Sequence, residues 1–204
     1  TGTGTSTTIA GLATGTYTFS VANSSGCTSS NSAGIVINTQ PPAASAPAVG
    51  TIAHPSCAVP SGSVDLSGLP ATGTWTLIRT PGAVTTTGTG TSTTITGLAA
   101  GTYTYTVSNS FGCTSIASAN VVINAQPATP AAPAAGTITQ PTCAVATGAV
   151  VLNGLPASGT WTLTRTPGAV TITGTGTSTT ITGLAAGTYN FTVSNTAGCN
   201  SVSS

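Results

Sequence analysis

GLAAGTYTYTVSN, at residues 97–109, decides the fold, and the chain repeats this stretch almost unchanged. It reads GLATGTYTFSVAN at residues 11–23 and GLAAGTYNFTVSN at residues 183–195. Its bulky side chains alternate, so that Tyr103, Tyr105 and Val107 share one face and threonines share the other. Alternation with a period of two indicates a β-strand with one buried face. The stretch therefore predicts the same core strand in three copies of a larger unit.

The larger unit is 86 residues long. GTGTSTT begins at Gly2, Gly88 and Gly174, and residues 88–118 match residues 174–204 at 24 of 31 positions. Stretches rich in Pro and Ala, at residues 40–50 and 126–136, have the composition of semi-rigid linkers. We therefore predict three parts: the C-terminal half of an Ig-like repeat at 1–40, a complete repeat at 41–126, and a repeat lacking the end of its last strand at 127–204.

Seven short strands are predicted in the complete unit. They lie near residues 50–56, 63–68, 73–80, 83–87, 92–97, 102–109 and 114–124, with Gly or Pro between them. β-Branched threonines fit such strands, and no segment has apolar residues at helical spacing. The expected fold is all-β, a tandem array of immunoglobulin/fibronectin-III-like β-sandwiches.

The chain has almost no charge: two Lys and Arg residues, one acidic residue and one His among 204 residues. No basic surface is available to neutralise phosphates, so we expect no nucleic-acid partner. No apolar run approaches the length of a membrane span. A net charge near zero favours association, which suits lateral packing of copies of the chain.

The aromatic residues have structural interpretations. Tyr17, Tyr103 and Tyr189 each start the predicted sixth strand, where sandwiches place a tyrosine corner whose hydroxyl bonds to backbone just upstream. An ordinary core tyrosine is the alternative. Trp75 and Trp161 fall on the predicted third strand, as core anchors or, alternatively, as an exposed platform for sugars.

Five cysteines recur in two phases, without a CxxC pair, which indicates disulfides and an oxidising, extracellular setting. We favour pairing within units, Cys57–Cys113 and Cys143–Cys199, with the partner of Cys27 outside the chain. In a standard sandwich, however, the two positions lie at opposite poles. A staple from Cys57 to Cys199 across the junction is then the alternative, and free buried thiols are a third.

Arg79 and Arg165 are the charges that recur, each in the sequence RTPGAV. A solvated turn residue is the favoured interpretation. The functional alternative is a contact between neighbouring repeats, through hydrogen bonds to carbonyl oxygens or to a glycan.

Catalysis requires titratable groups that are placed together. His54 is replaced by Gln140 in the next copy, and Asp65 by Val151, so neither takes part in a chemistry that the repeat performs. One acidic residue is also too few for calcium sites between units. We expect no catalytic, cofactor-binding or metal-binding residue, and no enzyme.

QPTC at residues 140–143, together with GLAAGTYxxTVSN and the following GC, resembles the repeats of very large secreted Bacteroidota proteins. These include gliding-motility adhesins exported by type IX secretion. The resemblance covers nearly the whole unit and implies a cell-surface protein that acts in adhesion or in a surface filament. Members often carry Asp after the sixth strand, where this chain has Asn109 and Asn195.

The leading hypothesis is a structural repeat array in an extracellular stalk, adhesin or fibre. The alternative is a self-assembling filament whose chains are joined by strand pairing. A carbohydrate-binding module is a third hypothesis. Expected partners are neighbouring repeats or other copies of the chain, with surface glycans as a further candidate.

Overall fold

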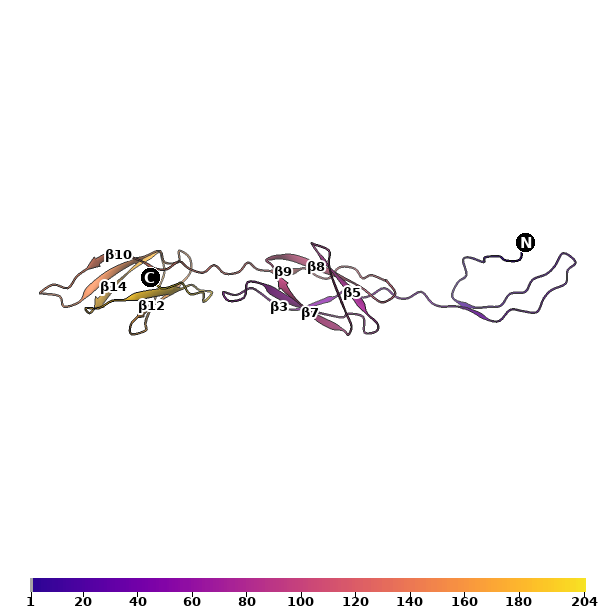
Figure 1. Ribbon diagram of the computed structural model, residues 1–204, viewed down its shortest axis with the longest axis horizontal. Coiled ribbons are helices and arrows are strands. Elements are labelled where there is room, and N and C mark those ends of the chain that lie inside the picture. The colour runs from indigo at the N-terminus through magenta and orange to yellow at the C-terminus, as the bar shows by residue number, and fades with distance from the viewer. Residues whose placement is uncertain (1) are drawn as a thin grey trace.

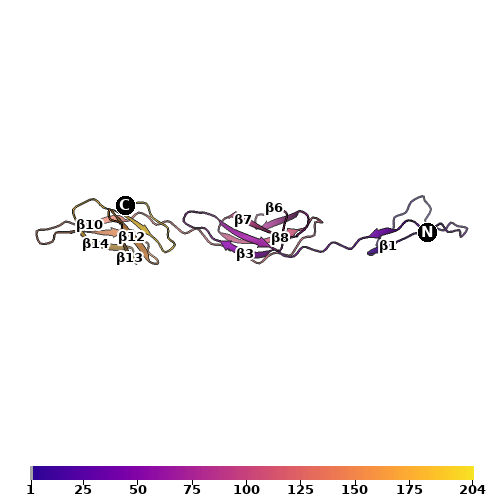
Figure 2. The same ribbon diagram turned by 90° about the horizontal axis from the view of Figure 1, so that it is seen from below.

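The computed structural model describes residues 2–204, so residue 1 of the predicted half-repeat at 1–40 lies outside the described residues. Three groups of strands follow one another along the long axis of the molecule, joined by extended linkers (Figures 1 and 2). We call them the N-terminal unit (β1–β2), the central unit (β3–β9) and the C-terminal unit (β10–β15). All the assigned elements in residues 2–204 are strands, which confirms the predicted all-β class.

The central unit is a sandwich of two antiparallel sheets. One has the order β3-β4-β7 and the other β6-β5-β8-β9. This arrangement is the expected immunoglobulin/fibronectin-III-like sandwich. Its strands are β3 (Ala48–Ala53), β4 (Gly62–Ser67), β5 (Trp75–Thr80), β6 (Val84–Gly88), β7 (Ser92–Leu98), β8 (Gly101–Ser108) and β9 (Val121–Ile123).

The last strand is much shorter than the predicted 114–124. Residues 114–120 still run beside β8, but two serines replace part of the regular ladder. Ser115 Oγ accepts the backbone N–H of Val107, and Ser118 Oγ accepts the backbone N–H of Tyr105, both at 3.0 Å. These serine side chains satisfy buried amides of β8 where the strand pairing is irregular.

The C-terminal unit repeats the arrangement, with sheets β10-β11-β14 and β13-β12-β15. Its strands are β10 (Ala134–Thr139), β11 (Gly148–Asn153), β12 (Trp161–Thr166), β13 (Val170–Gly174), β14 (Ser178–Leu184) and β15 (Asn190–Ser194). The N-terminal unit is a two-stranded antiparallel pair of β1 (Gly15–Tyr17) and β2 (Ile35–Ile37).

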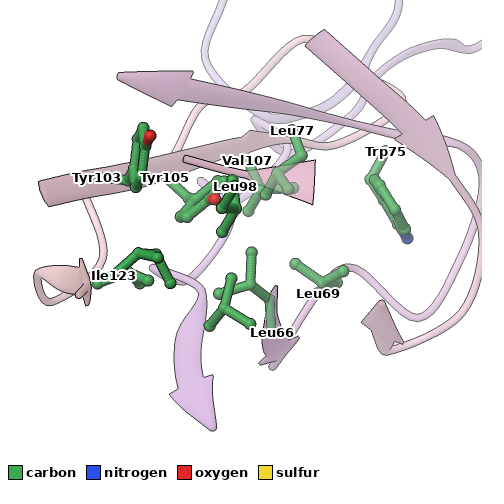
Figure 3. Packing of buried hydrophobic residues seen from close by; sticks show 11 residues of the cluster. Leu66, Leu69, Trp75, Leu77, Leu98, Tyr103, Tyr105, Val107 and Ile123 are labelled. Atoms are coloured by element: carbon green, nitrogen blue, oxygen red, sulfur yellow. The ribbon is translucent and has the colours of Figure 1, made fainter. Parts of the chain in front are cut away.

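The predicted strand alternation is confirmed in the core of the central unit. Along β8, Tyr103, Tyr105 and Val107 are buried, whereas the residues between them are partly exposed. Facing side chains from the other sheet complete the cluster (Figure 3). The buried set is Val64, Leu66, Leu69, Trp75, Leu77, Leu98, Tyr103, Tyr105, Val107, Val121 and Ile123.

Tyr105 carries a polar atom that the core does not satisfy. Its side chain is 1% exposed, and the hydroxyl is buried without a hydrogen-bond partner. Burial raises the pKa of Tyr105 above its ordinary value, because the phenolate would lose its solvation. Phenylalanine stands at the matching positions, Phe19 and Phe191.

We therefore expect Tyr105→Phe to raise the free energy of unfolding by about 1 kcal/mol at pH 7, since it removes an unsatisfied buried hydroxyl. In the unfolded chain this phenol ionises near pH 10, whereas the folded state holds its proton to higher pH, so wild-type stability falls above about pH 10. The advantage of the variant should therefore widen above pH 10. Urea unfolding followed by tryptophan fluorescence at pH 7 and at about pH 10.5 measures both effects.

Tyr103→Phe is the matched control, because it deletes a hydroxyl that does have a partner, at the Ala99 carbonyl. It should lower the free energy of unfolding by about 1 kcal/mol. Loss of stability in Tyr105→Phe equal to that of the control would contradict our account of the unpaired hydroxyl.

Candidate functional site at the junction between units

The tyrosine corner is present in all three copies. The hydroxyls of Tyr17, Tyr103 and Tyr189 donate to the carbonyl oxygens four residues upstream, at 2.9, 3.0 and 3.0 Å. Each copy therefore has the hydrogen bond that distinguishes a tyrosine corner from an ordinary core tyrosine. The bond fixes the loop that leads into β8 or its equivalent.

The two tryptophans are core anchors. Trp75 and Trp161 are each 2% exposed, which removes them from any sugar-binding platform. Their indole Nε1–H groups donate to the carbonyls of Gly90 and Gly176 at 2.8 and 2.7 Å. A Cβ added at Gly88 would lie 2.5 Å from the Trp75 ring. In the GTG sequence, Gly88 thus leaves space for the Trp75 ring, and Gly90 supplies the carbonyl that accepts its N–H.

The two arginines differ from both interpretations, the favoured solvated turn residue and the alternative contact between repeats. The Arg79 guanidinium lies over the ring of Tyr103 in its own unit, with Cζ 5.1 Å from the ring centroid. Arg165 lies in the same way over Tyr189, at 5.3 Å. Each half-buried cation therefore interacts with the π face of the corner tyrosine. It is a cation–π element within the unit, and not the solvated turn residue that we favoured.

The turn after β8 is built around one asparagine. Asn109 Oδ1 accepts the backbone N–H groups of Phe111 and Cys113 at 3.1 and 3.0 Å, and its Nδ2 donates to the carbonyl of Pro42 at 3.1 Å. This Asx turn presents the cysteine, and the amide donor holds the turn against the linker that enters the unit. We call it the Asn-Cys turn.

The Asn-Cys turn of the C-terminal unit has the same bonds. Asn195 accepts the N–H of Ala197 and of Cys199 at 3.1 and 3.0 Å, and donates to the Ala128 carbonyl at 2.8 Å. An Asp here would accept the same N–H groups but could not donate to the linker. The amide therefore explains why asparagine suits this position in this chain.

The disulfide corrects the pairing that we favoured from sequence. Cys57 is bonded to Cys199, with their Cα atoms 5.3 Å apart, so the bond crosses from the central unit to the C-terminal unit. Cys113 and Cys143, the expected partners within each unit, are free, as is Cys27. The structure therefore takes the alternative arrangement, the staple across the junction.

Topology is the physical reason for this pairing. Cys113 lies beside the entering linker, with its Sγ 3.7 Å from the carbonyl oxygen of Pro41. Cys57 lies beside the departing linker, where Gln126 Nε2 donates to the carbonyls of Ser56 and Cys57 at 3.0 and 3.4 Å. The two cysteines of one unit are thus at opposite poles, and each faces a neighbouring unit.

The junction therefore holds two ties. The disulfide joins the turn after β3 to the next unit, and Gln126 joins the linker to the same turn. Sequence reasoning placed Gln126 only in a linker, although Gln40 recurs 86 residues earlier and could have pointed to it. The sequence marked Asn109 and Asn195 as a difference from the similar repeats, but it did not indicate their bonds to the linkers.

The titratable side chains have structural partners. His54 Nδ1 accepts the N–H of Asn124 at 3.4 Å, and Asp65 Oδ1 accepts the Thr94 hydroxyl at 2.7 Å. Within residues 2–204, no group of three His, Cys, Asp or Glu side chains is placed to hold a metal ion. No helix long and apolar enough to cross a membrane occurs in the same residues. The chemistry that this site does show is the disulfide bond between Cys57 and Cys199.

A count of free thiols separates the two pairing schemes. The monomeric chain, denatured and alkylated without reduction, should show three free thiols, whereas pairing within units would leave one. Cys57→Ser should show four free thiols, because it releases Cys199. The free energy of complete unfolding should fall by about 5 kcal/mol, because the variant lacks the 142-residue loop that the disulfide closes.

Cys143→Ser is the matched control, because Cys143 lies in the equivalent turn of the C-terminal unit but is free. It should show two thiols and wild-type stability. Alkylation with mass spectrometry gives the counts, and denaturant unfolding gives the stability. A single free thiol in the monomeric chain would contradict the staple.

No family model and no curated protein matches the chain. Among solved structures, it is similar to the human OSCAR ligand-binding domain, at 13% identity and a TM-score of 0.32, over 80% of this chain and 99% of that one. It is similar to the FN1–FN3 domains of chicken CNTN1, at 17% and 0.31, over 93% and 74%. It is also similar to the BSP domain of a biofilm-associated protein, at 18% and 0.27, over 78% and 28%. At these scores the likenesses carry no argument about binding or activity.

Proposed function

We propose that this chain forms part of a structural repeat array in an extracellular stalk, adhesin or fibre. One observation carries the proposal: the Cys57–Cys199 bond ties consecutive units, and Gln126 holds the linker between them against the same turn. Such a tie restricts the relative movement of neighbouring units, which suits a stalk better than a flexible string of domains. A disulfide of this kind also requires an oxidising compartment, which supports an extracellular location.

The finer placement is a secreted surface protein of Bacteroidota that passes through type IX secretion. It is supported by the resemblance of the QPTC and GTYxxTVSNxxGC segments to the repeats of such proteins. In this setting the partners are neighbouring repeats and other copies of the chain, with surface glycans as a further candidate.

A structural role also fits how the recurring polar side chains are used. The corner tyrosines, the indole N–H groups and the turn asparagines bond to backbone of their own unit. His54 and Asp65 do not recur in the next copy. Because the recurring polar side chains are bonded to backbone, few of them are available for catalysis. We therefore propose that the array is not an enzyme.

A self-assembling filament is the second candidate. β3 and β6 are edge strands of the two sheets of the central unit, and neither carries a charged side chain. Charged residues on an edge strand normally prevent pairing with another chain, so these edges permit strand addition between copies.

Electron microscopy of the native material tests the proposal. The array predicts strings or fibres on intact cells that bind antibodies raised against residues 41–126. Isolated strings favour the stalk, and unbranched fibres in lateral register favour the filament. Compact particles, or antibody binding only after the cells are lysed, would overturn the extracellular array.

Resistance to trypsin is a prediction of the fold. The chain contains only two basic residues, Arg79 and Arg165, and each lies half-buried against its corner tyrosine. Cleavage requires local opening of the strand that carries the arginine, so the folded chain should stay intact. The heat-unfolded chain should give three fragments once the Cys57–Cys199 bond, which joins the first fragment to the last, is reduced. Gel electrophoresis after digestion at 25 °C and above the unfolding temperature measures this. Cleavage of the folded chain at the heat-unfolded rate would show that these strands are open.

A further inference from the structure

The bond between Cys57 and Cys199 has a register that the repeat reproduces. The two residues are 142 positions apart, and each has a counterpart one 86-residue step away. Cys57 corresponds to Cys143, and Cys199 corresponds to Cys113 and to Cys27. None of the three free cysteines lies 142 positions from another, so they cannot pair with one another in this register.

The turn that holds Cys143 is built like the turn that holds Cys57. Ser56 N–H donates to the carbonyl of Val59 at 2.9 Å, and the N–H of Val59 returns a bond to Ser56 Oγ at 3.2 Å. Thr142 and Val145 form the same two bonds at 2.8 and 3.2 Å. Cys143 is exposed at the pole that corresponds to the bonded one. It is therefore presented as Cys57 is presented to its partner.

The turn that holds Cys113 is likewise built like the turn that holds Cys199. Their Sγ atoms lie 3.7 and 3.8 Å from the carbonyls of Pro41 and Pro127, and both turns are held by the same asparagine bonds. They differ in burial: Cys199 is fully buried in the junction, and Cys113 is half-buried. The bonded turn of the neighbouring unit accounts for the difference. Cys113 thus shows the acceptor site before a neighbour covers it.

From this equivalence we infer that Cys143 is an inter-unit crosslinking site whose partner is the Asn-Cys turn cysteine of another unit of this kind. Cys113 and Cys27 are the complementary half-sites. Each unit then bonds to the unit before it and to the unit after it, whether these belong to the same chain or to another copy. The inference rests on the proposed array, but it concerns sulfur bonding and not cellular location, so either can fail alone.

The chemistry balances with a small disulfide, such as oxidised glutathione, as the oxidant. One cysteine thiolate attacks it, forms a mixed disulfide and releases one glutathione thiolate. The second cysteine thiolate attacks the protein-side sulfur and releases the other. One protein S–S bond forms, the glutathione S–S bond breaks, and the two protons from the protein thiols end on two glutathione thiols.

An extended chain tests pairing within one polypeptide. Residues 119–204 are added once more after Ser204, which keeps the 86-residue register. The added copy carries Ala197→Ser, the residue found at the matching Ser25, so that its Asn-Cys turn differs in mass. The chain is oxidised with glutathione, alkylated, and digested with pepsin in acid, where disulfides do not exchange.

We expect a peptide that links Cys143 to the mass-marked turn of the added copy. The alkylated fraction of Cys143 should fall by about tenfold or more relative to the 204-residue chain, because a disulfide sulfur is not nucleophilic. The Cys57–Cys199 peptide from the same digest shows that the units have folded. Cys143 that stays alkylated in molecules carrying this peptide, or that links to Cys199 of its own unit, overturns the inference.

The 204-residue chain by itself tests pairing between copies. Oxidised over a range of concentrations, it should form crosslinked dimers in which Cys143 of one copy joins Cys113 or Cys27 of another, and Cys143→Ser should abolish them. Such dimers identify a second copy as a source of the partner. A chain that remains monomeric here, while the extended chain pairs internally, identifies the same polypeptide as the source. Absence of Cys143 linkage in both experiments overturns the inference.

Discussion

The hydroxyl of Tyr103 donates to the carbonyl of Ala99 at 3.0 Å, and each sandwich depends on a set of bonds of this kind. A chain with almost no charged residues must satisfy its buried backbone with neutral donors and acceptors. The indole of Trp75, the amide of Asn109 and the hydroxyl of Ser115 do the same elsewhere in the unit. The repeated polar positions are therefore repeated because the backbone requires them.

The sequence predicted the sandwich and its core because that information is local. The alternation around Tyr103 and the fixed 86-residue step do not depend on how units contact one another. The last strand was overestimated because Ser115 and Ser118 bond to β8 through side chains, which a strand pattern does not distinguish from a ladder. The stacking of Arg79 on Tyr103 joins neighbouring strands, so spacing along the chain does not indicate it.

The cysteine pairing is a different case. Pairing within a unit and pairing across a junction give the same spacing pattern in a perfectly periodic sequence, so periodicity cannot choose between them. The choice depends on which pole of the sandwich each turn occupies, which is a property of the strand order. The linkers mark the poles, because Pro41 lies at the turn of Cys113 and Gln126 lies at the turn of Cys57.

The staple also determines how the chain bears tension. Residues 58–198 form a covalent loop that is closed by the Cys57–Cys199 bond, and this loop contains every strand from β4 to β15. Tension along the chain reaches Cys57 through β3 and crosses directly to Cys199, so the backbone of the strands within the loop does not carry it. Of the strands from β3 to β15, only β3, which pairs with β4, lies in the path of the force, so most of the noncovalent packing of marginal stability is spared. An array of such units can carry load along sulfur bridges and short connecting strands, while the sandwiches keep the bridges in position.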